Sequence, residues 1–446
     1  MREIVKDSIG TFGRQLVASL LGLATSATIA RAFGPAANGE LSISLLLPAM
    51  LVMFLNFGLV PSTIYHLSAQ KLTAHQWGVR CLRLFFALLG LGTAIGVTIL
   101  SLGARSLFPG VDTSTLWLAL LVFPVAFLAA LLHAALQGLN MFRALNVAII
   151  GQSILTLILV CALISLGRTE LQLLVTANIA AQAATCVWLI RLLWPKFQTK
   201  PPTEPQPPPS DSLLAYGFRS HLGNVVAFFN YKTDIFIVNY YLGPSLTGVY
   251  TVAVSIAERL SLVPHSVGTV LFPRLSRLSA ADEEQRRLTE VASRWTLVIT
   301  GLAAIPFAFA SGLLIIVVFG EAYSPAILPL ILIIPGFVLA SSSQVIANGI
   351  AARGRPDLNT VTAIFALAAN VASSCLLTPL IGLQGAALST TSALAINFAL
   401  KLYVHTRLAR SKWTSCVLLR REDLDALLSV VRARRGGRTA SDSMTR

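Results

Sequence analysis

The residues that could carry chemistry in this sequence lie inside apolar segments long enough to cross a bilayer. An ionisable side chain at membrane depth costs about 2.5–3.5 kcal/mol on insertion scales, so it is expected to hold a substrate, an ion or another charge. The residue types present suit the binding of an anion or the movement of a proton or cation. The candidates are Arg14, Arg219, Asn230, Lys232, Asp234, Glu258 and Arg259.

Helical spacing indicates which of these side chains share a face. Asn230 and Asp234 are four residues apart and lie on the same face, whereas Lys232 lies about 200° from each of them. Spacing therefore does not pair Lys232 with Asp234, and each needs a partner from another helix or a water-filled cavity. The adjacent residues Glu258 and Arg259 diverge by about 100°, so the same holds for them.

These charges allow three interpretations. In the first, they form interhelical ion pairs that only fix packing, for example between Asp234 and Arg259. In the second, the four basic residues, which outnumber the two acids, line a central cavity for an anionic group. Arginine suits phosphate because it donates two parallel hydrogen bonds. In the third, Asp234 or Glu258 is the site of a coupling proton or sodium ion.

Motifs of soluble enzymes are absent from the sequence. It contains no GxxxxGK[ST] phosphate loop, no HExxH zinc motif and no nucleophile elbow. The six histidines show no ligand spacing and the five cysteines form no CxxC pair, so we predict no metal site, no disulfide framework and no cofactor. These absences favour translocation over catalysis, and we predict that the chain is not an enzyme.

The elements that carry the candidates are predicted to be membrane helices. Of 446 residues, 55% are hydrophobic and 12% charged, and the mean hydropathy is +0.74, whereas soluble domains contain about 25% charged residues. This composition predicts an all-α integral membrane protein. We expect twelve transmembrane helices, near residues 11–32, 43–66, 84–107, 113–137, 146–166, 171–193, 215–241, 247–271, 295–319, 325–349, 358–378 and 384–405.

Basic residues are distributed unequally between the predicted loops. With a cytoplasmic N-terminus, 27 lysines and arginines fall on the cytoplasmic side, eleven of them from Lys401 onward, and 3 fall on the other side. Because cytoplasmic loops are enriched in these residues, we predict a multi-pass protein of the plasma (inner) membrane with both termini cytoplasmic. The net charge of +15 is thus explained mostly by the orientation of the chain in the membrane. It suits an anionic inner leaflet, and we predict no nucleic acid partner.

The stretch KPPTEPQPPP, residues 200–209, divides the chain into two halves of six spans. Its six prolines predict an extended polyproline linker. We therefore predict an N-terminal lobe over 1–199, a Pro-rich cytoplasmic linker over 200–212, a C-terminal lobe over 213–406 and a basic cytoplasmic tail over 407–446. The apolar positions near residues 424–431 allow either an interfacial amphipathic helix or a disordered tail.

The two halves repeat. Gly34-Pro35 follows the first span and Gly243-Pro244 follows the seventh, at a displacement of 209 residues, and both pairs are predicted to form outer turns. Because each half has an even number of spans, the repeat is parallel and the natural binding site is the cleft between the halves. This arrangement predicts that Arg14 faces Lys232 and Asp234 across the cleft.

Four blocks of sequence carry a resemblance to a known family. They are Phe33-Gly34-Pro35 with Gly39, YKTDIFIVNYYLGPSLTGVYTVAVSIAERL at 231–260, PHSVGTVLFPRLSRLS at 264–279, and GLQGAALSTT at 382–391. With twelve spans in two halves, the chain resembles the polysaccharide biosynthesis and oligosaccharide flippases of the multidrug/oligosaccharidyl-lipid/polysaccharide (MOP) exporter superfamily. The Asp of the seventh span and LFPRLS are the most specific parts.

The resemblance implies a V-shaped, MATE-like architecture and a function. Such a protein would flip a polyprenyl-diphosphate-linked oligosaccharide from the inner to the outer leaflet by alternating access, for export polysaccharide synthesis. Its partners would be this lipid-linked glycan, membrane lipids and other polysaccharide-assembly proteins. The resemblance implies that the four basic candidates meet the diphosphate, while Asp234 and Glu258 match the family pattern better than the basic residues do.

Four alternative functions stay open at this point. Lipid II-type peptidoglycan precursor flippases usually have fourteen spans, and MATE-type small-molecule antiporters for organic cations would need an acidic or aromatic cavity. A membrane-bound glycan polymerase or ligase usually has a large extracytoplasmic loop, and no predicted outer loop here exceeds about a dozen residues. A scaffold that binds lipid without moving it also remains.

Overall fold

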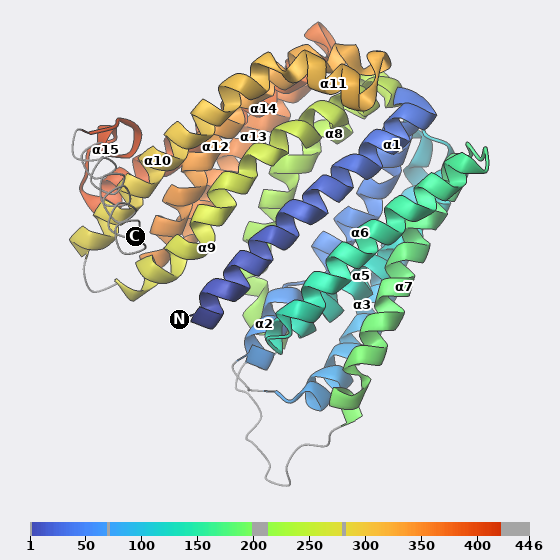
Figure 1. Cartoon of the computed structure of the whole chain (residues 1–446), viewed down its shortest axis with the longest axis horizontal. Helices are drawn as coiled ribbons and strands as arrows, with labels where there is room; N and C mark the ends of the chain where they lie inside the picture. Colours follow the sequence, from blue (N-terminus) through green and yellow to red (C-terminus); the bar gives the residue numbers. More distant parts are fainter. Residues whose placement is uncertain (1, 69–71, 199–212, 279–281, 421–446) are drawn as a thin grey trace, which may run out of the picture.

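The computed structural model describes residues 2–68, 72–198, 213–278 and 282–420, and these residues form helices joined by short turns (Figure 1). The first half contains α1 (Arg2–Leu55), α2 (Leu59–Ser68), α3 (Ala74–Leu107), α4 (Thr113–Leu120), α5 (Val122–Gly138), α6 (Phe142–Ser165) and α7 (Leu171–Gln198). The second half contains α8 (Leu213–Ala257), η1 (Glu258–Ser261), α9 (Leu262–Arg277), α10 (Asp282–Phe309), α11 (Ser311–Phe319), η2 (Glu321–Ala326), α12 (Ile327–Ala352), α13 (Pro356–Ile381), α14 (Leu383–Ala409) and α15 (Thr414–Val417).

Nine helical segments of the described residues are long and apolar enough to cross a membrane. The chain is therefore a multi-pass, all-α membrane protein, as its composition predicts. A kink divides the first of these segments, and α8 with α9 supplies two further apolar lengths outside the nine. The count is thus consistent with the twelve predicted spans. The linker over 200–212 and the tail from residue 421 lie outside the described residues.

The two predicted Gly-Pro turns are sharp kinks within α1 and α8. Gly34 has φ 78° and ψ 178°, and Gly243 has φ 79° and ψ 176°. Only glycine adopts this backbone region readily, and the proline after each glycine is preorganised to begin the next helical arm. The two kinks therefore have matching backbone geometry 209 residues apart.

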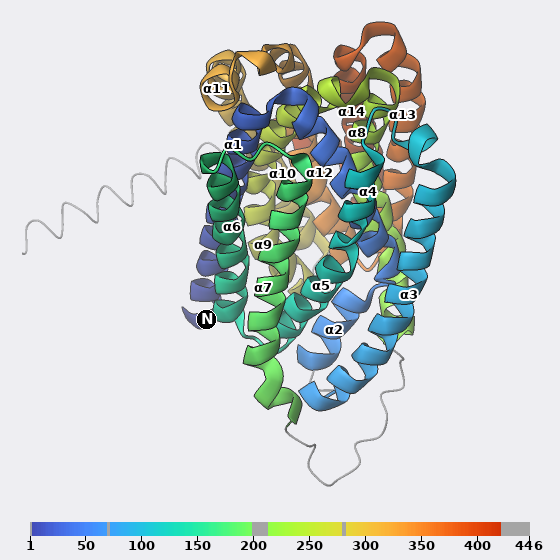
Figure 2. The same ribbon diagram turned by 90° about the vertical axis from the view of Figure 1, so that its right-hand side faces the viewer.

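The arms of α1 and α8 pack together and join the two halves of the bundle. Figure 1 shows α3, α5, α6 and α7 on one side, α10, α12 and α14 on the other, and α1 and α8 between them. In Figure 2 the kink of α1 lies near α11, at the end of the bundle opposite the N-terminus. We call this end the kink end.

At the kink end the two halves meet backbone to backbone. A Cβ atom on Gly39 would overlap the carbonyl oxygen of Pro244, and one on Gly248 would overlap the carbonyl oxygen of Pro35. These contacts are reciprocal because Gly39 and Pro35 are the repeat equivalents of Gly248 and Pro244. Asn38 adds a hydrogen bond from Nδ2 to the Gly248 carbonyl at 3.2 Å. Glycine is required at both positions for this approach.

Two further contacts hold the kink end closed. The guanidinium of Arg31 donates from Nε to the carbonyl of Val318 at 2.9 Å and from Nη2 to the carbonyl of Val317, at the C-terminus of α11. A cation is favourable there because the carbonyl ends of a helix carry partial negative charge. Asn239 donates to the carbonyl of Pro109 at 3.3 Å.

Beyond residue 406, where the lobe was expected to end, the chain stays packed on the second half. α14 continues to Ala409, and α15 contacts α10. Cys416 of α15 is fully buried. The first part of the predicted basic tail therefore belongs to the bundle.

Candidate functional site

The helical arm that follows Gly243 is interrupted where its charged residues lie. α8 ends at Ala257, the 3-10 segment η1 follows, and α9 begins at Leu262. Pro264 explains the interruption, because its ring clashes with the carbonyl of Leu260 and it donates no backbone hydrogen bond. Glu258 and Arg259 thus occupy a short 3-10 stretch, a feature common at functional hinges.

Lys232 and Glu258 form an ion pair between the first arm of α8 and η1. Their Nζ and Oε1 atoms are 3.4 Å apart, and the side chains are 36% and 35% exposed. Glu258 also turns toward two cavities, so both charges remain accessible. Partly exposed ion pairs contribute little to stability, and the pair can therefore open to admit another anion or cation.

The first of these cavities lies between the two halves and has a volume of about 280 Å³. We call it the interlobe cavity. It is lined by both α1 and α8, so its shape depends on how the halves are placed. Its polar lining consists of Ser26, Asn38, Ser42, Lys232, Thr251, Ser255 and Glu258.

The second cavity, which we call the polar cavity, has a volume of about 600 Å³. It is lined by α8, η1, α9, α12 and α14, and α1 contributes one residue from the other half. Its polar lining consists of Ser19, Tyr231, Glu258, Arg259, Ser261, His265, Ser343, Gln344, Asn397 and Lys401. Because Glu258 lines both cavities, the two meet at this carboxylate.

Arg259 connects the polar cavity to the first half of the molecule. Its Nη1 donates to Ser19 Oγ on α1. Its Nε atom is buried, and no described residue accepts a hydrogen bond from it. A buried donor without an acceptor is costly, and an incoming anion would satisfy it.

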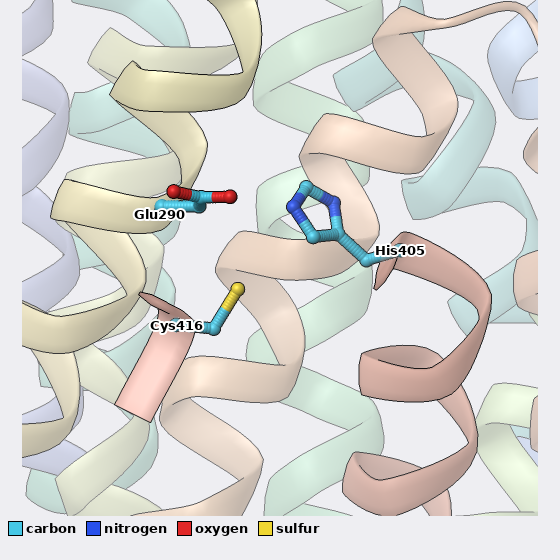
Figure 3. A group of neighbouring side chains, drawn as sticks. All are labelled: Glu290, His405 and Cys416. Carbon is cyan, nitrogen blue, oxygen red and sulfur yellow. The ribbon is translucent and has the colours of Figure 1, made fainter. Parts of the chain in front are cut away.

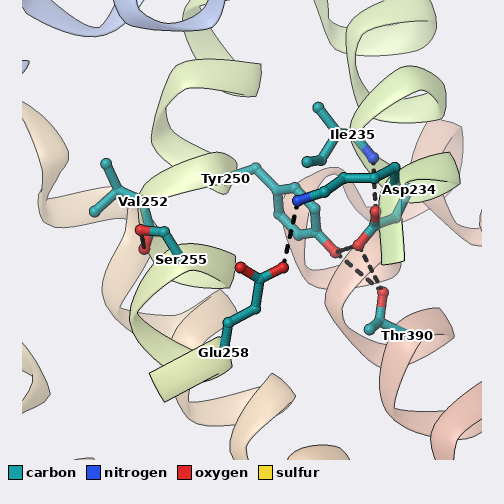
Figure 4. A network of polar contacts seen from close by, with 8 residues as sticks. Asp234, Ile235, Tyr250, Val252, Ser255, Glu258 and Thr390 are labelled. Carbon is teal, nitrogen blue, oxygen red and sulfur yellow. Dashed lines mark hydrogen bonds and ion pairs between the residues drawn. The ribbon is translucent and has the colours of Figure 1, made fainter. Parts of the chain in front are cut away.

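Asp234 has a different environment, shown in Figure 4. Its side chain is 2% exposed. Its Oδ2 accepts hydrogen bonds from the hydroxyl of Tyr250 at 2.8 Å and from Thr390 Oγ1 at 3.2 Å, and its Oδ1 accepts the backbone N–H of Ile235 at 2.8 Å. The carboxylate is thus held within the second half, where α8 meets α14.

The structure separates the predicted site residues into groups. Lys232, Glu258 and Arg259 line the cavities. Asn230 turns toward α13 instead, and its Nδ2 donates to the carbonyl of Ala363 at 3.0 Å. Asp234 and Asn230 lie on one face and Lys232 on another, as the spacing predicts.

The packing pair suggested for Asp234 and Arg259 is not formed, because Asp234 bonds to Tyr250 and Thr390 while Arg259 bonds to Ser19. Asp234 also does not face the first half, contrary to the arrangement expected from the repeat. The side chains of Arg14 and Arg219 lie outside the described residues.

Several polar residues of these sites were not singled out from the sequence. Tyr250 and Thr390 complete the Asp234 network, and Gln344, Asn397 and Lys401 line the polar cavity. Lys401, which was grouped with the cytoplasmic basic residues, lies within α14. The sequence did indicate that Lys401 lies within the membrane, since it falls inside the last predicted apolar span.

The fold is similar to the folds of solved membrane transporters. The lipid II flippase MurJ in an inward closed conformation matches with a TM-score of 0.70 at 18% identity, covering 90% of this chain and 87% of that one. An inward-facing multidrug resistance MATE family transporter matches with a TM-score of 0.66 at 18% identity, covering 89% and 96%. At these identities the likeness concerns the fold alone.

The family follows from the sequence itself. The model of a family described as polysaccharide biosynthesis protein matches residues 28–328, and the chain belongs to this family. It is similar to a probable low-salt glycan biosynthesis flippase, Agl15, of Haloferax volcanii, at 25% identity over 195 residues, or 42% of this chain and 40% of that protein. It is also similar to a putative O-antigen transporter of Shigella flexneri, at 25% identity over 199 residues, or 44% and 47%. The matches span less than half of either relative.

Proposed function

We propose that this protein flips a polyprenyl-diphosphate-linked oligosaccharide from the inner to the outer leaflet of the plasma membrane, for the synthesis of an exported polysaccharide. The observation that carries the proposal is the half-buried guanidinium of Arg259, whose buried Nε has no acceptor among the described residues, in a polar cavity of about 600 Å³ inside a membrane protein. A diphosphate needs such donors, and arginine binds it bidentately. The two relatives named as a glycan flippase and an O-antigen transporter support the substrate class.

Different residues of the cavity would bind the diphosphate and the sugars of such a substrate. Arg259 and Lys232, freed from Ser19 and Glu258, would bind the diphosphate. The hydroxyl and amide groups of Ser343, Gln344 and Asn397 would accept and donate to sugar hydroxyls. The lipid tail would stay in the bilayer, and translocation would involve no covalent step.

The proposed cycle is alternating access. With both termini in the cytoplasm, as the basic loops predict, the kink end faces outward and the closed contact at Gly39 and Gly248 represents the inward-directed state. Opening this contact would expose the interlobe cavity to the outer leaflet. Other proteins that assemble the polysaccharide would be its partners, in keeping with the family description.

We further propose that Asp234 is the coupling site for a proton or sodium ion. Its carboxylate and the neighbouring hydroxyls of Tyr250 and Thr390 offer oxygen ligands to a hard cation and a position for a proton. The network bridges α8 and α14 without reaching the cavities, so a bound cation would act on helix packing and not directly on the substrate.

Transport in proteoliposomes with a labelled polyprenyl-diphosphate oligosaccharide tests the proposed function. We expect Arg259→Ala to reduce the flipping rate about 10- to 100-fold, because a charge-assisted hydrogen bond contributes about 1.5–3 kcal/mol. The matched control is Arg168→Ala, whose side chain is 62% exposed and distant from the cavities, and it should keep the wild-type rate.

Equal rates for Arg259→Ala and wild type would overturn the assignment of the diphosphate site. Parallel assays with a labelled peptidoglycan precursor and with an organic cation separate the competing transport functions. Preferential flipping of the precursor, or efflux of the cation with no glycan flipping, would overturn the proposed substrate.

A further inference from the structure

Three side chains of metal-binding type meet at the junction of α10, α14 and α15. They are Glu290, His405 and Cys416, and one ligand atom of each lies within 4.8 Å of the other two. Figure 3 shows the carboxylate, the imidazole and the sulfur pointing toward one another from three separate helices. None of the three lines the cavities proposed for transport.

The cluster is buried, and several of its polar side-chain atoms lack hydrogen-bond partners in the part of the chain that the structure describes. Glu290 is 7% exposed, and His405 and Cys416 are both 0% exposed. Neither ring nitrogen of His405 has a hydrogen-bond partner among the described residues, and Oε1 of Glu290 has none either. Buried polar atoms are almost always bonded, because leaving them unpaired costs free energy. An unpaired carboxylate oxygen and an unpaired imidazole that both lie beside a buried thiol indicate a missing ligand.

We propose that Glu290, His405 and Cys416 bind a divalent transition-metal ion, with zinc as the best fit. Zinc takes carboxylate oxygen and imidazole nitrogen at about 2.0–2.2 Å and thiolate sulfur at about 2.3 Å, in tetrahedral geometry. Its ligand atoms therefore lie about 3.3–3.8 Å apart, which rotamer adjustments of these side chains can reach from the observed spacing. Water would take the fourth position.

The positive charges around the cluster are compatible with a bound dication, because its protein ligands would neutralise it. Arg286 and Arg353 act electrostatically on His405, and Arg294 and Arg420 act on Cys416. These arginines would repel a weakly bound cation. A dication held by one thiolate and one carboxylate is a neutral centre, however, so it adds no charge beside them. The thiolate also selects zinc, cobalt or copper over magnesium and calcium.

Metal binding would be coupled to loss of a proton. A cysteine thiol must lose its proton to become a metal ligand. A metal displaces this proton to the solvent as it binds the thiolate. Binding is therefore expected to tighten as the pH rises.

The site would fix α15 against the bundle. This helix has only four residues, and the backbone around Cys416 is already held by Ser293 Oγ, which donates to the Cys416 carbonyl at 3.1 Å, and by Arg294, which donates to the Ser415 carbonyl. A metal adds a bond from α15 to both α10 and α14. The role we assign is structural, at the point where the chain leaves the last long helix.

Cobalt binding to full-length, tag-free protein in detergent tests the proposal. After removal of metals with a chelator, titration with Co²⁺ should give a thiolate-to-cobalt charge-transfer band that saturates at one equivalent and is abolished by Zn²⁺. Cys416→Ser should lose the band. Glu290→Gln and His405→Gln should weaken Zn²⁺ binding by more than about tenfold, the lower bound for changes even to outer-shell residues.

The controls are Cys161→Ser and Cys375→Ser, which remove exposed cysteines and should leave the band unchanged. Glu290→Gln is isosteric, so it keeps the test valid if Cys416→Ser fails to fold. Absence of the band in folded wild-type protein, or its survival in Cys416→Ser, would overturn the proposal. So would Zn²⁺ binding by Glu290→Gln and His405→Gln that equals wild type.

Discussion

At the scale of single residues, Asp234 differs from the other intramembrane charges. Lys232, Glu258 and Arg259 face cavities, whereas Asp234 is enclosed by Tyr250 and Thr390. If it carries the coupling ion, Asp234→Asn should keep the fold while flipping no longer responds to an imposed proton or sodium gradient. Flux assays in proteoliposomes with and without each gradient measure this response.

The control for this variant is Asp357→Asn, an exposed carboxylate that pairs with Arg355 and should retain the response. An Asp234→Asn protein that still responds to the gradient would refute the coupling role. If it also unfolds more readily than wild type, the carboxylate would serve packing alone.

Sequence spacing placed these side chains on the correct helix faces but could not identify their partners. Lys232 bonds to Glu258 and Asp234 to Tyr250, so the two side chains have separate partners, as expected from their spacing on the helix. Thr390 is 156 residues from Asp234, and only the packing of α14 on α8 brings them together. The same reason hid the cluster of Glu290, His405 and Cys416, whose members lie on three helices with no local ligand spacing.

At the scale of elements, the two kinked helices were the most predictable feature. A Gly-Pro pair specifies a positive φ followed by a helix start, and both pairs adopt this geometry. The 3-10 segment η1 was not predicted, although Pro264 signalled it, because a proline in a membrane helix can be accommodated in several ways.

Alanine substitution at the kinks should destabilise the protein. Gly34→Ala and Gly243→Ala meet no neighbouring atom, so their cost comes from the backbone conformation alone and should be about 1–3 kcal/mol each. Unfolding in detergent measures the change. Gly151→Ala is the matched control, since it also meets no atom but lies within α6. Equal stability of kink and control variants would contradict this account.

At the scale of the whole molecule, the backbone contact at the kink end holds the two halves in one relative position. A methyl group at Gly39 would overlap the backbone of Pro244, so Gly39→Ala should shift the protein toward an outward-open state. In a background without native cysteines, a cysteine at the buried position Thr247 should then react faster with an impermeant maleimide. Flipping should slow, because the closed state is disfavoured.

Gly22→Ala serves as the control for this substitution, because its added Cβ meets open space and should leave both rates unchanged. Unaltered labelling in Gly39→Ala would show that the contact does not govern access from the kink end.

The kink in α1 also affects residues far from it along the helix. Ser19 lies fifteen residues before Gly34, which is about 22 Å along a helix. A rigid-body rotation of about 15° at the kink, a size known for other domain movements, would displace Ser19 by about 6 Å. Its hydrogen bond to Arg259 would then break. A small rotation at the kink of α1 would therefore change the state of the Arg259 guanidinium, from bonded to Ser19 to free to bind another acceptor.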